Sequence, residues 1–172
     1  MKKIIIQIFI AALLWFLMFS PYTSHLLNFW ISMTISAIIL ITLSINNNKD
    51  IIKQFDFKFS AIILGLLSAV VLWLIFYLGE YFSTLLFDFA RPQVDSIYSM
   101  RDGYNKILIG VGLLFIIGPA EEIFWRANIQ QFFIDKYGEW KALIITTLIY
   151  ALVHIWSFNF VLIMAALICG AF

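Results

Sequence analysis

The chain has 172 residues, of which 63% are hydrophobic and only 12% are charged. A soluble domain of this length needs a more polar surface, so most of these side chains have lipid as their solvent. The formal net charge of +1 excludes a strongly basic nucleic-acid binder, and the single cysteine excludes a disulfide framework and a cysteine-based zinc site.

Five hydrophobic stretches approach the roughly 20 residues that a membrane-spanning helix needs. In chain order they are residues 4–20, 26–45, 60–79, 107–134 and 142–156. The fourth is predicted to be interrupted at Gly118-Pro119, because proline removes a backbone hydrogen bond. A sixth begins at Phe160 and stops after about 13 residues, too short to cross at about 1.5 Å per residue. We therefore predict an all-α fold, a multi-pass transmembrane bundle of about five spans plus a truncated sixth, in one domain over residues 1–172.

The connecting segments indicate an orientation. Residues 51–59 are predicted to lie at the interface, and residues 88–106 are predicted to form a loop. Lysines before the first span, between the second and third, and between the fourth and fifth predict a cytoplasmic N-terminus by the positive-inside rule. We expect the chain to lie in a cell membrane, that of a bacterium. Arg91, Arg101 and Lys106 run against this rule, because their loop would then face outward.

Tryptophans lie near or within the predicted spans. Lipid contact and interfacial anchoring account for them there. The residues concerned are Trp15, Trp30, Trp73 and Trp140.

One segment concentrates charge inside a predicted span: Gly118-Pro119-Ala-Glu121-Glu122-Ile-Phe-Trp-Arg126. Each ionised side chain at a helix centre costs a few kcal/mol to insert, so we expect these groups to face the protein interior. Glu122 and Arg126 are spaced i,i+4 and can form an ion pair. Glu121 is rotated by about 100° and has no obvious partner on its own helix. This makes Glu121 the candidate general base for water activation.

The predicted hairpin around Gly138 brings a histidine to the same depth. Glu122 lies 16 residues before Gly138 and His154 lies 16 residues after it. Tyr150, at i−4 from His154, projects from the same face. A carboxylate and an imidazole at one depth can share a water or hold a metal such as zinc, with Glu121 and His154 as its candidate ligands. The alternatives are a histidine that only bonds a neighbouring helix and a Glu122–Arg126 pair that is only structural.

This combination resembles the CPBP family, which contains CAAX prenyl proteases and bacteriocin-processing intramembrane proteases and is also called Abi. The family's Glu-Glu-x-x-x-Arg motif stands here at Glu121-Glu122 to Arg126, and its Phe-x-x-x-His motif stands at Tyr150 to His154, with tyrosine for phenylalanine. The resemblance covers about residues 114–172, within a family-like core of about 107–172. It implies that Glu121 activates the attacking water, that Glu122 supports the site through Arg126, and that His154 binds the water or a metal. A metalloprotease and a metal-free glutamate protease both remain open.

Two features depart from the family pattern. Ala127 stands where glycine often follows the arginine of the motif, and no histidine follows His154 to supply the family's third motif. We expect a truncated chain, a partner chain that completes the site, or a protein that does not cut peptides.

The leading hypothesis is a membrane-embedded endopeptidase, alone or in an oligomer, that acts on a peptide, a prenylated peptide or a bacteriocin. The alternative is a non-catalytic bacteriocin immunity or membrane scaffold protein of the same fold. A proton-coupled transporter subunit would also place glutamate and histidine within the membrane.

Overall fold

The computed structural model describes residues 1–54 and 58–172, and these residues contain helices and no strand. Five helical stretches are long and apolar enough to cross a membrane: α1 (Lys2–Phe19), α2 (Phe29–Asn47), α3 (Phe59–Leu86), the continuous run Lys106–Tyr137, and Glu139–Ser157. The run Lys106–Tyr137 comprises α5 (Lys106–Gly112), η3 (Leu113–Ile117), α6 (Gly118–Glu122), η4 (Ile123–Gln130) and α7 (Gln131–Tyr137). Glu139–Ser157 comprises α8 (Glu139–Val153) and η5 (His154–Ser157), and α9 (Phe160–Ala171) follows as a shorter apolar helix. The predicted all-α transmembrane bundle is confirmed.

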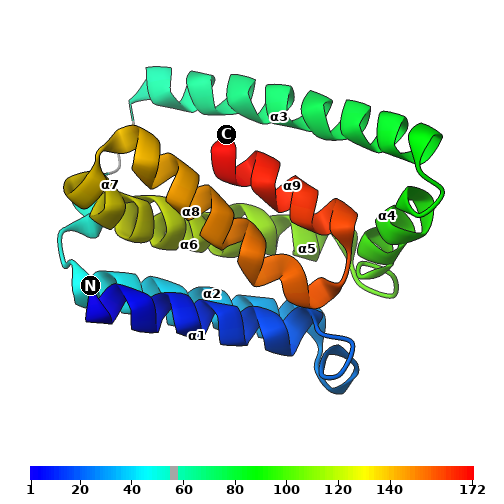
Figure 1. Ribbon diagram of the computed structural model, residues 1–172, viewed down its shortest axis with the longest axis horizontal. Coiled ribbons are helices and arrows are strands. Elements are labelled where there is room, and N and C mark those ends of the chain that lie inside the picture. Colours follow the sequence, from blue (N-terminus) through cyan, green and yellow to red (C-terminus); the bar gives the residue numbers. More distant parts are fainter. Residues whose placement is uncertain (55–57) are drawn as a thin grey trace.

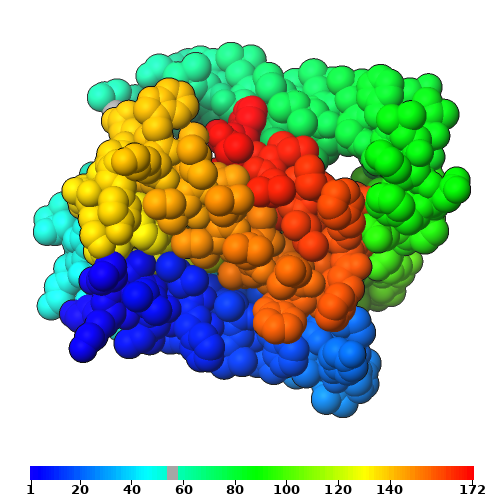
Figure 2. Space-filling view, viewed as in Figure 1, coloured from blue at the N-terminus to red at the C-terminus, as the bar shows by residue number. Residues whose placement is uncertain are grey.

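The long helices lie roughly parallel, in a bundle with α3 at one edge (Figure 1). The α1–α2 hairpin covers one side, the run from α5 to α7 passes through the middle, and α8 packs extensively along α9. Helix α3 has no buried residue, and its main contact is with α4 (Ala90–Ser99). The space-filling view shows α3 along the margin of the molecule, joined to the rest at its α4 end (Figure 2). The bundle core is therefore built without α3.

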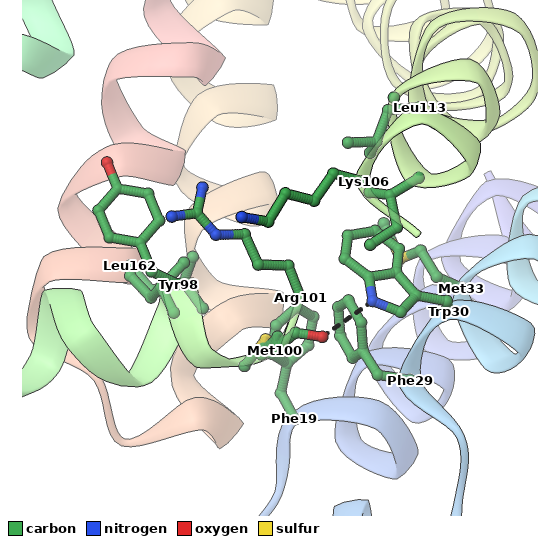
Figure 3. Close-up of a pocket in the computed structure, with 13 residues that line it drawn as sticks. Phe19, Phe29, Trp30, Met33, Tyr98, Met100, Arg101, Lys106, Leu113 and Leu162 are labelled. Atoms are coloured by element: carbon green, nitrogen blue, oxygen red, sulfur yellow. Dashed lines mark hydrogen bonds between the residues drawn. The ribbon is translucent and has the colours of Figure 1, made fainter. Parts of the chain in front are cut away.

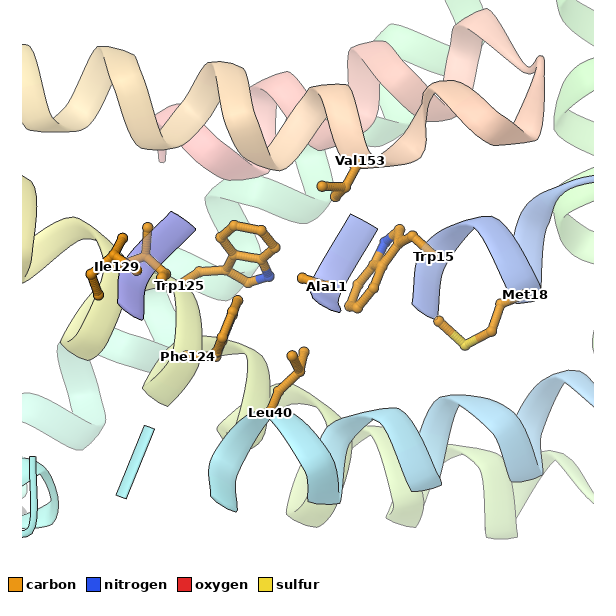
Figure 4. Packing of buried hydrophobic residues seen from close by; sticks show 9 residues of the cluster. Ala11, Trp15, Met18, Leu40, Phe124, Trp125, Ile129 and Val153 are labelled. Carbon is orange, nitrogen blue, oxygen red and sulfur yellow. The ribbon is translucent and has the colours of Figure 1, made fainter. Parts of the chain in front are cut away.

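The core is a cluster of aromatic and aliphatic side chains where α1, α2, η4 and α8 meet (Figure 4). Trp15 from α1 and Trp125 from η4 are each 1% exposed and pack edge-to-face, with ring centroids 6.4 Å apart. Leu40 of α2 and Phe124 of η4 are fully buried beside them. Because lipid is as apolar as these side chains, this cluster stabilises the bundle through close packing rather than through removal from water.

A buried amide network joins the same helices. Asn128 donates from Nδ2 to Gln7 Oε1 at 2.9 Å and accepts at Oδ1 from Asn47 Nδ2 at 2.9 Å. Gln7 in turn donates to the Leu43 carbonyl at 3.0 Å. Polar groups in a lipid-surrounded bundle must find partners within the protein, so these bonds fix the register of α1, α2 and η4.

The prediction of a loop over residues 88–106 was wrong in part, because this connection contains the ten-residue helix α4. Ala90 and Val94, one turn apart, are its buried residues, and Gln93 ties it to the start of α9. Asn159 donates to the Gln93 carbonyl at 2.8 Å, and Gln93 Oε1 accepts from the Val161 N–H at 3.0 Å. These tertiary hydrogen bonds stabilise a helix in a segment whose polar composition predicts a loop.

The interface segment predicted over residues 51–59 is described in part. It begins with a short 3₁₀ turn, η2 (Ile51–Gln54), and residues 55–57 lie outside the described part of the chain.

Candidate active site

The helix that carries the two glutamates is not broken at Gly118-Pro119 as expected, but continues through π-helical turns on both sides of α6. The Gly118 N–H donates to the Leu113 carbonyl, an i→i+5 bond, and a Cβ built at Gly118 would lie 2.8 Å from that oxygen. Pro119, in the first turn of α6, has no N–H to place. The helix therefore accommodates the glycine and the proline by changing its hydrogen-bonding pattern, without a break. Such π turns occur frequently at functional sites.

A cavity of about 730 Å³ lies between α3 and the helices that carry the predicted site residues. Glu121, Glu122 and Arg126 line it from the α6–η4 stretch, and Tyr150 lines it from α8. The remaining lining residues are Gly65, Ser68, Ala69 and Leu72 of α3, Trp125, Cys169 and Phe172. Four predicted site residues thus share one cavity. The α3 wall was not predicted, although its small residues at Gly65, Ser68 and Ala69 are visible in the sequence.

Glu121 has a partner on the neighbouring helix. The Tyr150 hydroxyl donates to Glu121 Oε2 at 2.9 Å. The hairpin at Gly138, with φ of 82°, brings α8 alongside the glutamate helix. The Tyr150 ring packs edge-to-face on Trp125 with centroids 5.3 Å apart. This packing fixes the direction of the hydroxyl, and the hydroxyl in turn orients the carboxylate at the cavity wall.

Arg126 links the glutamate helix to the end of α9. Its Nη2 donates to the Cys169 carbonyl at 2.7 Å, whereas its Nε lies 3.9 Å from Glu122 Oε2. The guanidinium therefore joins η4 to α9 through a backbone carbonyl. Gly170 allows α9 to pack closely on α8, because a Cβ there would lie 3.0 Å from Thr147 Cα. The Glu122 side chain is 60% exposed, so its ion pair with Arg126 is the weaker of the two contacts.

His154 is buried but does not line the cavity. Its Nε2 accepts from Trp15 Nε1 at 2.9 Å, and its Nδ1 lies 2.7 Å from the Tyr150 carbonyl, to which it donates. An indole N–H can only donate, so Nε2 is the acceptor nitrogen and both ring nitrogens are occupied. The imidazole also packs against Phe19 with centroids 5.7 Å apart.

The placement of Trp15 corrects the expectation that it contacts lipid. Only 1% of the side chain is exposed, and it anchors α1 to the end of α8 through His154. Nothing in the local sequence distinguishes Trp15 from a lipid-facing tryptophan, because its partner lies 139 residues away along the chain.

The described residues around the cavity do not provide the ligands that zinc requires. A catalytic zinc site takes three protein ligands. In the part of the chain that the structure describes, no group of three or more His, Cys, Asp or Glu side chains is placed to hold a metal ion. Glu121 and Glu122 share the cavity, while the nitrogens of His154 are taken by Trp15 and the Tyr150 carbonyl. This arrangement does not fit a zinc site, so we derive no step through a metal.

Fold and site together define a helical membrane protein with paired carboxylates at the wall of a cavity between α3 and the rest of the bundle. Residues 103–172 match the family described as "Type II CAAX prenyl endopeptidase Rce1-like". This match confirms the resemblance to the CPBP and CAAX protease family over that part of the chain, and it supports a CAAX-protease-type membrane endopeptidase. No curated protein and no solved structure matches the chain.

Proposed function

We propose that the chain hydrolyses a peptide bond in the cavity beneath α3, with Glu121 as the general base. The observation that supports this most directly is the Glu121 carboxylate, held by the Tyr150 hydroxyl at 2.9 Å at the wall of a cavity of about 730 Å³. An ionisable side chain within a membrane-spanning helix is costly and marks a functional site by default. The family match over residues 103–172 supports the same assignment.

In the proposed reaction, a water molecule lies between Glu121 and the scissile carbonyl. Glu121 takes a proton from the water as the water oxygen bonds to the carbonyl carbon. Negative charge develops on the carbonyl oxygen, and Arg126 is the cation on the same cavity wall that would stabilise it. The carbon–nitrogen bond then breaks, and Glu121 returns the proton to the leaving nitrogen.

His154 has a positioning role in this proposal. Its Nδ1–H holds the Tyr150 carbonyl, and its Nε2 is bonded to Trp15, so the imidazole fixes the end of the helix that presents the tyrosine hydroxyl. Binding of the water by His154, which the family resemblance implies, would require the Trp15 bond to open first.

The proposed substrate is a prenylated peptide, with a bacteriocin peptide as the second choice. Helix α3 has no buried residue and faces the cavity with Gly65, Ser68, Ala69 and Leu72. Because small side chains leave room beside the carboxylates, a peptide with a lipid chain can enter between α3 and the bundle directly from the membrane.

A non-catalytic immunity or scaffold role is the second candidate. The observation that favours it is that Arg126 and His154 join helices, through Cys169 and Trp15 respectively. This role predicts that protection against a bacteriocin survives Glu121→Gln but fails when Glu122 and Arg126 are both replaced.

The test is cleavage of a farnesylated CAAX peptide by the purified chain in detergent. Glu121→Gln should lower the turnover by about 100- to 10,000-fold, the usual contribution of a general base. Glu139→Gln is the matched control, because this exposed carboxylate lies in the same hairpin but outside the cavity. Turnover by Glu121→Gln equal to that of Glu139→Gln, with both variants folded, would exclude Glu121 as the base.

A further inference from the structure

A second cavity, of about 440 Å³, lies at the opposite end of the bundle from the Gly138 turn and shares no lining residue with the candidate active site. Its walls are mainly aromatic and aliphatic, and come from α1, α2, α4, α5, η3 and α9 and from the turn after α4 (Figure 3). Among the described residues that line it, two are charged, Arg101 and Lys106. The cavity therefore combines an apolar interior with two cations.

The two cations converge on one point. Figure 3 shows the Arg101 guanidinium and the Lys106 ammonium directed toward each other over the cavity. Among the residues that the structure describes, Arg101 lies over the Tyr98 ring, 4.9 Å from its centroid, and no ion pair joins either cation to a carboxylate. By contrast, Arg91 on the same connection pairs with Glu80 at 3.5 Å. Two exposed cations directed toward each other attract an anion that lies between them, because each like charge then gains an opposite charge.

The backbone that carries these cations is fixed in place. Trp30 Nε1 donates to the Met100 carbonyl at 2.9 Å, next to Arg101 (Figure 3). Asn28 Nδ2 donates to the Tyr104 hydroxyl at 2.9 Å. Asn105 caps α5 by accepting from the N–H groups of the first turn, immediately before Lys106. The cation pair is therefore held by the ends of α2 and α5 rather than by a free loop.

The charged end of the cavity lies at the start of a candidate membrane span. Lys106 is the first residue of the candidate span Lys106–Tyr137, so its charge lies where a headgroup lies. Met33, Ile109 and Leu113 line the cavity one to two turns further along α2 and η3–α5. A ligand with an anionic head and an apolar tail satisfies both ends of the cavity, whereas a small inorganic anion satisfies only one.

We infer that this cavity is a binding site for an anionic phospholipid, with the phosphate between Arg101 and Lys106 and an acyl chain along Met33, Ile109 and Leu113. Basic pockets between transmembrane helices bind anionic headgroups in this way. The site also accounts for two of the three cations that run against the positive-inside rule, Arg101 and Lys106, because they are retained for a ligand; the third, Arg91, pairs with Glu80. The inference is independent of the proposed peptidase activity.

The test is native mass spectrometry of the purified full chain with dioleoylphosphatidylglycerol or dioleoylphosphatidylcholine. We expect tighter binding of phosphatidylglycerol. Arg101→Gln should weaken it about fivefold and the double variant Arg101→Gln/Lys106→Gln about 30-fold, from roughly 1 kcal/mol per cation. The control Lys3→Gln/Lys141→Gln removes the same net charge from exposed positions outside the cavity and should retain binding. Equal binding of the two lipids, or an unchanged affinity in the double variant, would overturn the inference.

A second variant tests the apolar part while both cations stay in place. Gly110 lines the cavity, and a Cβ there meets nothing within 4 Å, so Gly110→Leu can fill the space without a clash at its Cβ. Leucine is also a better helix former than glycine, so the variant should fold. We expect Gly110→Leu to weaken phosphatidylglycerol binding and Gly110→Ala to weaken it less. Glycerol phosphate, the headgroup without chains, should not displace the lipid. Displacement by it, together with full binding by Gly110→Leu, would show an anion site without lipid recognition.

Discussion

Replacing Gly118 by alanine should be destabilising, although alanine is normally the better helix former by up to about 1 kcal/mol. The added Cβ would lie 2.8 Å from the Leu113 carbonyl oxygen, a backbone atom that moves only if the π-helical turn moves. Overpacking of this kind costs about 1–3 kcal/mol, so the net change is a loss of up to about 2 kcal/mol in the free energy of unfolding. Glu121 follows three residues later, and a displacement of about 1 Å in a reacting group can cost about 100-fold in rate.

Gly112→Ala is the matched control, because it lies in the same helical run and its Cβ would meet nothing within 4 Å. Unfolding in mixed detergent micelles should show Gly112→Ala as stable as the native chain or up to about 1 kcal/mol more stable. Peptide cleavage should fall for Gly118→Ala only. Equal stability and equal cleavage in the two variants would refute the reasoning that the Leu113 carbonyl requires glycine at position 118.

Four further outcomes follow from particular contacts. Tyr150→Phe should lower kcat about 10- to 100-fold, since it removes a hydrogen bond to a carboxylate worth roughly 1.5–3 kcal/mol while the ring still packs on Trp125; an unchanged kcat in a folded variant would contradict this. Trp15→Phe should cost about 1–3 kcal/mol of stability, measured by unfolding in micelles, by leaving His154 Nε2 buried without its donor, and the loss should be absent when His154 is already replaced by Phe. The hydrogen bond to Glu80, together with burial, raises the pKa of Tyr98 above its ordinary 10.0. The stabilising contribution of this bond is therefore present below pH 10.0 and is lost as the pH rises through the raised pKa of Tyr98. Absorbance titration should show the pKa of one phenol falling in Glu80→Gln, and an unchanged pKa would contradict the bond. Treatment with 1,10-phenanthroline should leave cleavage intact, and its loss with restoration by zinc would reinstate a metal site.

Composition and hydrophobic run length predicted the architecture well, because a chain that is 63% hydrophobic must use lipid as a solvent and helices as its spanning elements. The predicted spans differ from the observed ones by a few residues at most ends, except that α3 continues to Leu86. Local sequence could not predict α4, since it is stabilised by bonds from Gln93 to residues more than 60 positions away.

The site was predictable where residues share a helix and less so where distant helices meet. The spacing of Glu121, Glu122 and Arg126 indicated one charged segment, and the Gly138 hairpin indicated that α8 lies beside it. The depth comparison counted 1.5 Å per residue throughout, but π turns carry more residues per turn than an α-helix. Tyr150 meets the glutamate, whereas both ring nitrogens of His154 are bonded elsewhere.

The contacts that His154 makes instead come from α1 and could not be inferred from spacing. Trp15 approaches from a helix at the other end of the chain, and the cavity wall of small residues comes from α3. Each depends on how separate helices pack, which single-helix periodicity does not encode.

The most direct test of the central claim compares Glu121→Gln with Glu122→Gln in single-turnover cleavage of a farnesylated CAAX peptide by the reconstituted chain. Glu121 is bonded to Tyr150, whereas Glu122 is 60% exposed and 3.9 Å from its cation. We expect a loss of at least about 100-fold for Glu121→Gln, as for a general base, and a loss of no more than about fivefold for Glu122→Gln, as for a partly exposed ion pair. Equal losses in the two variants, or a larger loss for Glu122→Gln, would contradict the assignment of Glu121 as the base.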